Sequence, residues 1–184
     1  MTKKRYQIQI ALRGSKPKIW RRILVSSDLL LPDFHEIIQT TMGWDNSHLH
    51  QFIQNRTFYT PRMKDEDYWG DMDGIDYSKI KISDLLKKEK DKIVYEYDFG
   101  DSWEHDIILE KVVNNGINKN TPICLTGRNN CPPEDCGGVW GYANMLEIIK
   151  HPDHEEYEDY IDWLGEEFDP KYFDKKEINE MLKT

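Results

Sequence analysis

The sequence has no long hydrophobic run and no signal-peptide pattern. No stretch of about 18 consecutive apolar residues occurs, so we expect no transmembrane helix. The opening stretch, MTKKRYQIQIALRG, alternates polar and apolar residues instead of forming a continuous apolar segment, and it lacks a small-residue cleavage site. We therefore expect a cytoplasmic protein without a membrane partner.

Cysteine is scarce, and several catalytic motifs are missing. The odd number of cysteines, together with the missing signal peptide, argues against a disulfide framework and favours reduced thiols or metal ligands. No G-x-S-x-G nucleophile elbow occurs. Gly137-Gly138-x-x-Gly141 matches neither a dinucleotide fingerprint nor a Walker loop, and is more typical of a closely packed helix start. The cysteines are Cys124, Cys131 and Cys136.

Acidic residues are absent from residues 1–27, although the whole chain has a net charge of −9. That segment carries +8, which leaves −17 for the rest of the chain. An acidic body disfavours non-specific binding along a phosphate backbone. The basic segment either docks on the protein's own acidic surface or forms a small patch that faces an anion. Its basic residues are Lys3, Lys4, Arg5, Arg13, Lys16, Lys18, Arg21 and Arg22.

Apolar residues suffice for one core, and their spacing predicts strands near the start of the chain. The chain has 184 residues, 38% of them hydrophobic, which suits a single domain over residues 1–184. Alternation predicts strands at residues 6–12 and 19–25, joined into a hairpin by the turn RGSKPK. Arg21 falls among apolar neighbours in the second strand, where its guanidinium needs an acidic partner or a route to water.

A helix and a third strand follow this hairpin. Helical spacing predicts a helix that begins near Pro32 and ends at Gly43. The stretch SHLHQFIQ then alternates, which places His48, His50 and Phe52 on one face of a strand. We expect residues 54–80 to form a long loop or short strands.

Residues 91–113 form the clearest predicted hairpin, with YDFGDSWEH at its turn. A three-residue loop from Gly100 to Ser102 would pair Tyr97 with His105. The opposite face would then set carboxylates directly across from one another, so we expect water, a cation or a basic neighbour against that face.

The last third of the chain is predicted to be irregular and then helical. Residues 122–138 are rich in Pro, Gly and Asn, which argues against a regular element. The part from about residue 140 to 184 reads as helices, with capping-box spacing after Asp153 and Asp174. The sequence therefore predicts an α+β fold: an antiparallel sheet of two hairpins and one extra strand, packed by helices that include the C-terminal segment.

Histidines and cysteines are candidates for a metal site, with Zn²⁺ as the typical ion. Alternation puts the imidazoles of His48 and His50 on one side of a strand, as strand-borne metal sites require. His105, Cys131 and Cys136 could complete the site in space. The alternative is that the histidines form hydrogen bonds beside the core and the thiols are small apolar side chains.

Four acids form a second candidate constellation. Asp98 and Asp101 lie at the predicted turn, and Glu134 and Asp135 follow two prolines. Clustered carboxylates can hold a divalent cation through oxygen ligands, or one of them can act as a general base. The alternative is that they have structural roles in turns.

Four separated stretches together resemble a known family. IWRRILV, LPDFHEIIQTTMGWDNSHLHQF, YEYDFGDSWEHDIILEK and CPPEDCGGVWGYANMLEII occur in this order. They resemble the plasmid pRiA ORF-three-like family from about Tyr6 to Leu182. The resemblance implies one compact α+β domain, found in mobile-element and chromosomal proteins, with no established biochemical activity. Some relatives carry a transposon-resolvase label, but the acidic body and the lack of a basic recognition helix argue against that activity here.

We expect a binding module with a pocket beside the DFGDSWEH turn, because aromatic rings around a few polar groups are the usual lining of a ligand pocket. Its ligand or protein partner is open. One alternative is a metal-dependent hydrolase that uses His48, His50, His105 and nearby carboxylates. A second is a nucleic-acid accessory factor that acts through residues 3–22. The expected pocket residues are His48, His50, Asp98, Asp101, Trp103, His105, Glu134 and Asp135.

Overall fold

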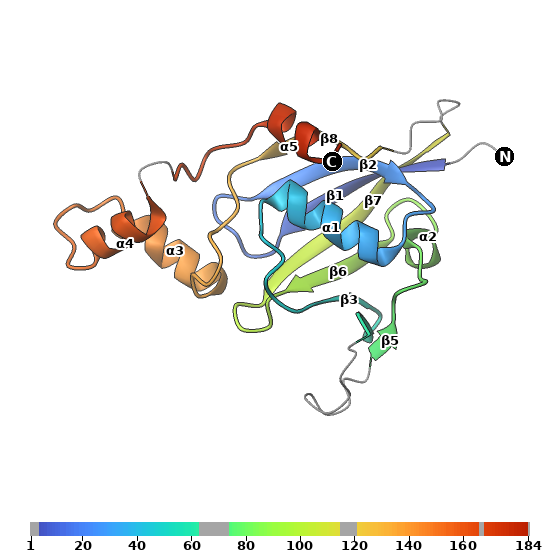
Figure 1. Cartoon of the computed structure of the whole chain (residues 1–184), viewed down its shortest axis with the longest axis horizontal. Coiled ribbons are helices and arrows are strands. Elements are labelled where there is room, and N and C mark those ends of the chain that lie inside the picture. Colours follow the sequence, from blue (N-terminus) through green and yellow to red (C-terminus); the bar gives the residue numbers. More distant parts are fainter. Residues whose placement is uncertain (1–3, 63–73, 115–120, 166–167, 184) are drawn as a thin grey trace.

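A computed structural model describes residues 4–62, 74–114, 121–165 and 168–183. Its strands form one sheet in the order β5-β4-β3-β6-β7-β1-β2-β8, and every neighbouring pair is antiparallel except β4 and β5. Helices pack on and beside this sheet, so the predicted α+β class is confirmed (Figure 1). The strands are β1 (Lys4–Leu12), β2 (Trp20–Ser26), β3 (His50–Gln54), β4 (Thr57–Thr60), β5 (Gly74–Asp76), β6 (Lys92–Tyr97), β7 (Trp103–Asn114) and β8 (Ile123–Arg128). The helices are α1 (Leu31–Met42), α2 (Ile82–Leu85), α3 (Gly138–Ile148), α4 (Tyr157–Leu164) and α5 (Lys175–Met181).

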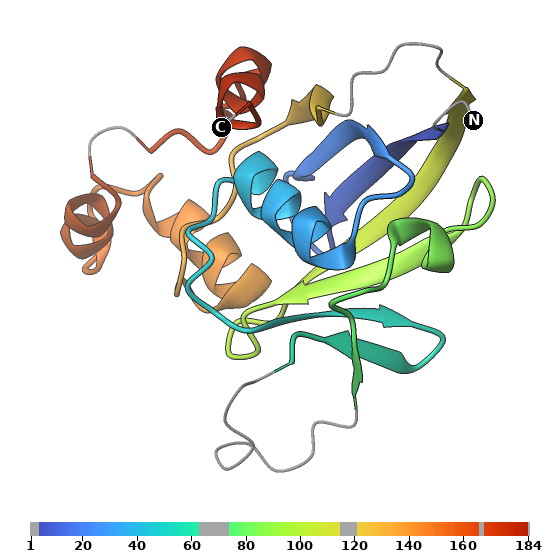
Figure 2. The ribbon, with the colours of Figure 1, turned by 45° about the vertical axis from the view of Figure 1, so that its right-hand side comes forward.

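The core lies between α1 and the sheet. The helix crosses one face of the strands (Figure 2), and Phe34 and Ile38 on its inner side are fully buried. Fully buried Ile8 and Ile23 belong to the same hydrophobic cluster. The helix ends as predicted at Gly43, whose φ of 97° is the left-handed conformation that glycine adopts without strain.

The first predicted hairpin is confirmed, because β1 and β2 pair antiparallel. Arg21 is 2% exposed, and no acidic side chain pairs with it in the part of the chain that the structure describes. Its guanidinium instead donates to the backbone oxygens of Thr41, Trp20 and Arg128 at 2.7, 3.0 and 3.1 Å. Burial lowers its pKa, and the carbonyls supply the hydrogen bonds that a buried cation requires.

The second hairpin exists, but its predicted register is wrong. Tyr97 pairs with Trp103 and Tyr95 pairs with His105, so the loop runs from residue 98 to 102. The strand ends early because Asp98 takes a left-handed φ of 56° and its carbonyl accepts a hydrogen bond from Ser102 N at 2.6 Å.

The basic neighbour expected against the acidic face of this hairpin is present. Glu96 lies directly across from Glu104. Arg13 pairs with Glu104 and, at 2.6 Å, with Asp106. Ion pairs of this kind offset the repulsion between facing carboxylates.

A second arginine of the basic start also docks on the acidic body. The guanidinium of Arg22 donates two hydrogen bonds to Glu110, at 2.6 and 2.7 Å. Docking of the basic segment on the protein's own acids is therefore confirmed for Arg13 and Arg22. Lys3 lies outside the described residues.

Residues 123–128 form strand β8, so the prediction of a wholly irregular stretch over 122–138 is wrong. The strand pairs with β2, from Leu24 to Trp20. A partner distant in sequence thus overrides a composition rich in turn residues.

The C-terminal helices occur where the sequence predicts them. The Asp174 side chain caps α5 by accepting from the backbone N–H groups of Lys176 and Glu177. Asp153 caps nothing, because α4 starts after Glu156 without a side-chain cap. Among the described residues, no helix combines the length and apolar character that crossing a membrane requires. A cytoplasmic location and a single domain over residues 1–184 stay predictions.

Candidate functional site

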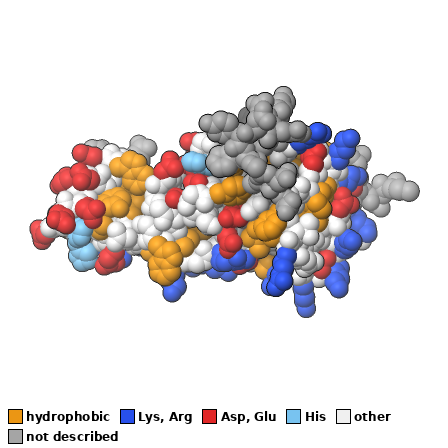
Figure 3. Space-filling model, turned by 90° about the horizontal axis from the view of Figure 1, so that it is seen from below, with side chains coloured by type: hydrophobic (Ala, Val, Ile, Leu, Met, Phe, Trp, Pro, Cys, Tyr) orange, Lys and Arg blue, Asp and Glu red, His pale blue; other side chains and the backbone are white. Residues whose placement is uncertain are grey.

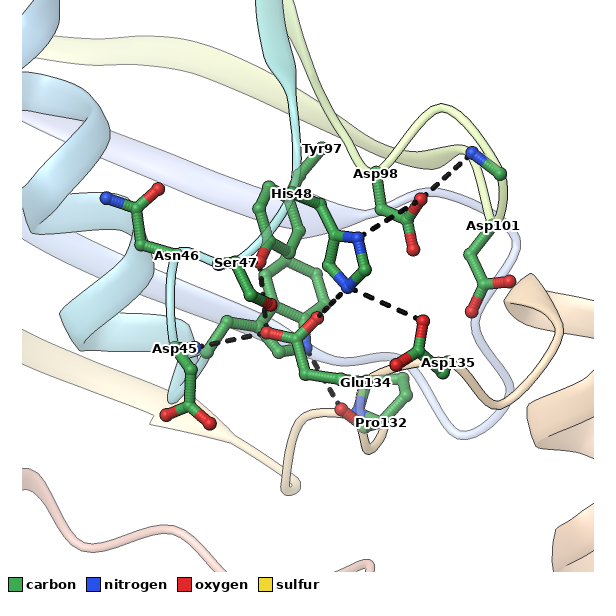
Figure 4. Close-up of polar contacts among 12 residues, drawn as sticks. Asp45, Asn46, Ser47, His48, Tyr97, Asp98, Asp101, Pro132, Glu134 and Asp135 are labelled. Carbon is green, nitrogen blue, oxygen red and sulfur yellow. Dashed lines mark hydrogen bonds and ion pairs between the residues drawn. The ribbon is translucent and has the colours of Figure 1, made fainter.

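His48 faces three carboxylates from two loops (Figure 4). It lies in the connection between α1 and β3. Its Nε2 is 3.6 Å from Glu134 Oε2 and 3.5 Å from Asp135 Oδ1, and its Nδ1 is 3.9 Å from Asp98 Oδ1. These distances exceed those of charge-assisted hydrogen bonds, about 2.7–2.9 Å. The imidazole therefore stands among the carboxylates without a hydrogen bond to any of them.

Left-handed backbone places two of the three carboxylates. Asp98 and Asp135 both have φ of 56°, a conformation that Asp tolerates better than most side chains. Asp98 is held by its own backbone N–H, which donates to Leu49 O at 2.8 Å, and by its Oδ1, which accepts from Gly100 N at 2.9 Å. The loop after β6 thereby fixes one acid on the Nδ1 side of His48.

The third carboxylate, Glu134, is fixed at one oxygen and free at the other. Its Oε1 accepts from the Tyr97 hydroxyl at 3.0 Å and from Asp45 N at 3.1 Å. Its Oε2 is buried, and no hydrogen-bond donor reaches it in the part of the chain that the structure describes. Burial raises the pKa of Tyr97, and the nearby Glu134 carboxylate raises it further, so the hydroxyl stays protonated and donates.

The donor set fits a divalent cation. Ligand atoms of His48, Asp98 and Asp135 all lie within 4.8 Å of one another. Imidazole nitrogen and carboxylate oxygen together suit ions such as Mn²⁺ and Zn²⁺. Glu134 and Asp135 face Nε2 while Asp98 faces Nδ1. A carboxylate on the far nitrogen is the usual support of a metal-bound histidine.

The three predicted imidazoles do not converge, and this part of the predicted site is wrong. His50 points into the core, where its ring stacks on His35 with centroids 3.5 Å apart and its Nε2 is 2.5 Å from the Tyr77 hydroxyl. His105 is fully buried, with Nδ1 3.3 Å from Tyr95 O. Burial lowers the pKa of His50 to about 3 and that of His105 to about 4, so both rings are neutral.

Trp103 and the predicted thiol ligands also do not join the His48 cluster in the described residues. Trp103 is fully buried beside Trp44, with ring centroids 5.9 Å apart. Cys131 is buried, and burial raises the pKa of its thiol. The pKa of Cys136 is raised to about 12 by burial and by nearby Asp101. Neither thiol joins a ligand cluster in the described residues, which agrees with their interpretation as small apolar side chains.

Asp101 and the glycines have packing roles. The Asp101 carboxylate accepts from Gly137 N at 3.1 Å, at the start of α3. A Cβ atom added at Gly138 would lie 2.5 Å from Asp101 O, and one at Gly141 would lie 1.9 Å from Cys136 O. The glycines thus let α3 lie directly against the two loops that carry the acids, as the sequence predicts for a close helix start.

Sequence reasoning missed Tyr97 as a positioning group and missed His35 entirely. His35 lies on the buried face of α1, and its Nε2 is 2.7 Å from Asn46 Oδ1 while its Nδ1 is 2.8 Å from the Tyr95 hydroxyl. Its spacing from Leu31 and Ile38 would have assigned it to the apolar face of the helix. No local signal marks Tyr97, since its hydroxyl meets Glu134 only in the folded chain.

Comparisons with known proteins show the family of this chain and two proteins similar to it. The family model described as Plasmid pRiA4b ORF-3-like protein matches residues 4–177. The uncharacterized protein y4hQ of Sinorhizobium fredii (strain NBRC 101917 / NGR234) is 34% identical over 161 residues, which are 86% of this chain and 80% of that protein. The crystal structure of MM3350, a protein of unknown function from Methanosarcina mazei Go1, has 38% identity and a TM-score of 0.83, and the match covers 96% of this chain and 98% of that one.

Proposed function

We propose that this chain, which belongs to the family of plasmid pRiA4b ORF-3-like proteins, is a metal-binding module. The function of the matched relatives y4hQ and MM3350 is not known, so the proposal rests on the geometry of the His48 site. The His48 site takes a divalent ion, Mn²⁺ or Zn²⁺. His48 Nε2, Glu134 Oε2 and Asp135 Oδ1 are the ligands. Asp98 orients the imidazole from the Nδ1 side.

The single observation that carries this proposal is the buried Oε2 of Glu134, which has no donor among the described residues. A buried carboxylate oxygen left without a partner costs about 1–3 kcal/mol or more. Two further carboxylates around the same imidazole add repulsion. A divalent cation removes both penalties at once.

Two distances from His48 Nε2 agree with a metal site. Ligands about 2.1 Å from a tetrahedral ion lie about 3.4 Å from one another. The separations of Nε2 from the Glu134 and Asp135 oxygens are 3.6 and 3.5 Å. Three protein ligands leave further positions of the ion for water or for a bound molecule.

The two alternatives from the sequence have less support. A hydrolase built on three imidazoles would require His50 and His105 at the site, and both are bound in the core. A nucleic-acid factor would use the basic start, but Arg13 and Arg22 are paired with acids of the protein.

The test is titration with MnCl₂ and with ZnCl₂ by calorimetry, on protein purified without chelator or affinity tag. We expect one site per chain for one of these ions, and at least tenfold weaker binding in Glu134→Gln and His48→Ala. His151→Ala is the matched control, because that histidine is exposed on the surface and paired with Glu147. Thermal unfolding without metal verifies that each variant folds.

Either of two results would overturn the proposal. One is that the unaltered protein shows no stoichiometric binding of either ion. The other is that Glu134→Gln and His48→Ala bind as tightly as His151→Ala.

A further inference from the structure

A groove of about 480 Å³ shares Glu134 and Asp135 with the His48 site. Its acidic wall consists of Asp45, Glu134 and Asp135, and its apolar wall includes Trp163, Leu164 and Phe168. No Lys or Arg is among its described lining residues. The groove therefore joins a negative side to an aromatic side, which suits a positively charged group on an apolar stem.

The helix that forms the apolar wall has no buried residue of its own. The Trp163 indole on this helix is 49% exposed, although it lies at the edge of the groove. An exposed large aromatic ring beside a hollow is typical of a surface that another molecule covers.

The charge of this region extends beyond the groove. Residues 151–165 and 168–170 contain seven acids and no Lys or Arg. Among the described residues, no salt bridge neutralises Glu158, Asp159 or Asp162 of α4. Figure 3 shows acidic and hydrophobic side chains gathered at the end of the molecule where α3 and α4 lie, away from most of the Lys and Arg. An acidic surface along a helix about 12 Å long exceeds what one small cation requires.

We propose that the groove and α4 bind an arginine-rich peptide segment of a partner protein. One arginine enters the groove, where its guanidinium meets the Asp45 and Asp135 carboxylates and stacks on the Trp163 indole. Arg fits better than Lys, because its planar guanidinium pairs with carboxylates at two points and stacks on aromatic faces. Neighbouring arginines of the segment lie along the acids of α4.

This inference does not require the metal, although the metal ion and the arginine share Asp135, and the metal ligand Glu134 also lines the groove. A bound metal ion neutralises these carboxylates and therefore weakens binding of the peptide. The bound peptide weakens binding of the metal by the same factor. Peptide binding is accordingly measured in EDTA, and metal binding is measured without peptide. If one of these measurements shows no binding, the other still tests its own proposal.

The experiment is fluorescence anisotropy with a fluorescein-labelled peptide of four arginines alternating with glycines, at low salt in EDTA. We expect saturable binding that weakens with added NaCl. Trp163→Ala and the double variant Asp45→Asn, Asp135→Asn should each weaken it at least fivefold. Trp140→Ala is the matched control and should stay within twofold, because Trp140 is 85% exposed but does not line the groove.

Several outcomes would overturn the proposal. If a peptide with citrulline in place of arginine bound as tightly, the charge of arginine would not contribute to binding. If Trp140→Ala weakened peptide binding as much as Trp163→Ala, the groove would not be the binding site. Competition by free arginine amide at the same concentration as peptide would assign the groove to a small cation. Self-association of the chain in sedimentation, abolished by Trp163→Ala, would assign it to a second copy.

Discussion

Two histidine clusters in this protein differ in how completely their polar atoms are satisfied. At the stacked pair in the core, His35 has a partner at each ring nitrogen, and the Tyr95 hydroxyl that it meets also accepts from Gln39. At the outer site, His48 has three carboxylates within 4.0 Å but none at hydrogen-bonding distance. The Oε2 of Glu134 has no donor in the described part of the chain.

The difference separates a structural role from a binding role. A closed network stabilises the fold and has no free donor or acceptor left for a ligand. A network with unsatisfied polar atoms lowers stability when no ligand is bound. Such sites persist where the function of the protein uses them. The following predictions test this contrast, from the largest expected effect to the smallest.

The largest effect is expected at the closed network. His35→Ala removes a buried ring and takes one hydrogen-bond partner each from the Tyr95 hydroxyl and from Asn46 Oδ1, so we expect the free energy of unfolding to fall by about 2–4 kcal/mol. Urea unfolding measures this, with His48→Ala in EDTA as the comparison. The contrast fails if both variants lose the same amount.

An intermediate effect is expected from acid. Folding lowers the pKa of His50 from 6.5 to about 3 and that of His105 from 6.5 to about 4, so the unfolded chain binds protons that the folded chain does not. Stability is therefore complete above pH of about 6.5 and falls as the pH drops, by up to about 1.4 kcal/mol per pH unit for each ring.

Substitution of His50 isolates the contribution of this ring to the loss of stability in acid. Between pH 7 and pH 5, His50→Gln should lose about 2 kcal/mol less than the unaltered protein. Urea unfolding at the two pH values measures the difference. Parallel losses would show that the buried imidazole already takes up its proton in the folded state.

The smallest effect is expected at the open cluster. Asp135 is exposed, and its neighbours at the site include two other carboxylates, so Asp135→Asn in EDTA should leave the free energy of unfolding unchanged or raise it by about 0.5 kcal/mol. Chemical denaturation is again the measurement. A loss above about 1 kcal/mol would mean that this carboxylate stabilises the fold in the absence of metal.

Local patterns predicted the elements well, because their causes are local. Alternation located β1 and β2, and Gly43 marked the end of α1. Strand β8 was missed because its stability comes from pairing with β2, which is distant in sequence. The register of the second hairpin was missed because it depends on the left-handed turn at Asp98.

The site was predicted in part. Four of its residues, His48, Asp98, Glu134 and Asp135, do lie together. His50 and His105 were assigned to it because period-two alternation predicts which face of a strand a side chain occupies. It does not predict which side chains pack against that face. In the folded chain those neighbours are aromatic rings of the core, and they exclude water from both imidazoles.

The contact between Gly141 and the carbonyl of Cys136 has a mechanical consequence. A Cβ atom at position 141 would lie 1.9 Å from Cys136 O, so any larger residue there would force α3 away from the loop that carries Glu134 and Asp135. Those two carboxylates lie 3.6 and 3.5 Å from His48 Nε2, and α4 packs against α3. The placement of the two carboxylates beside His48 therefore depends on a glycine at position 141.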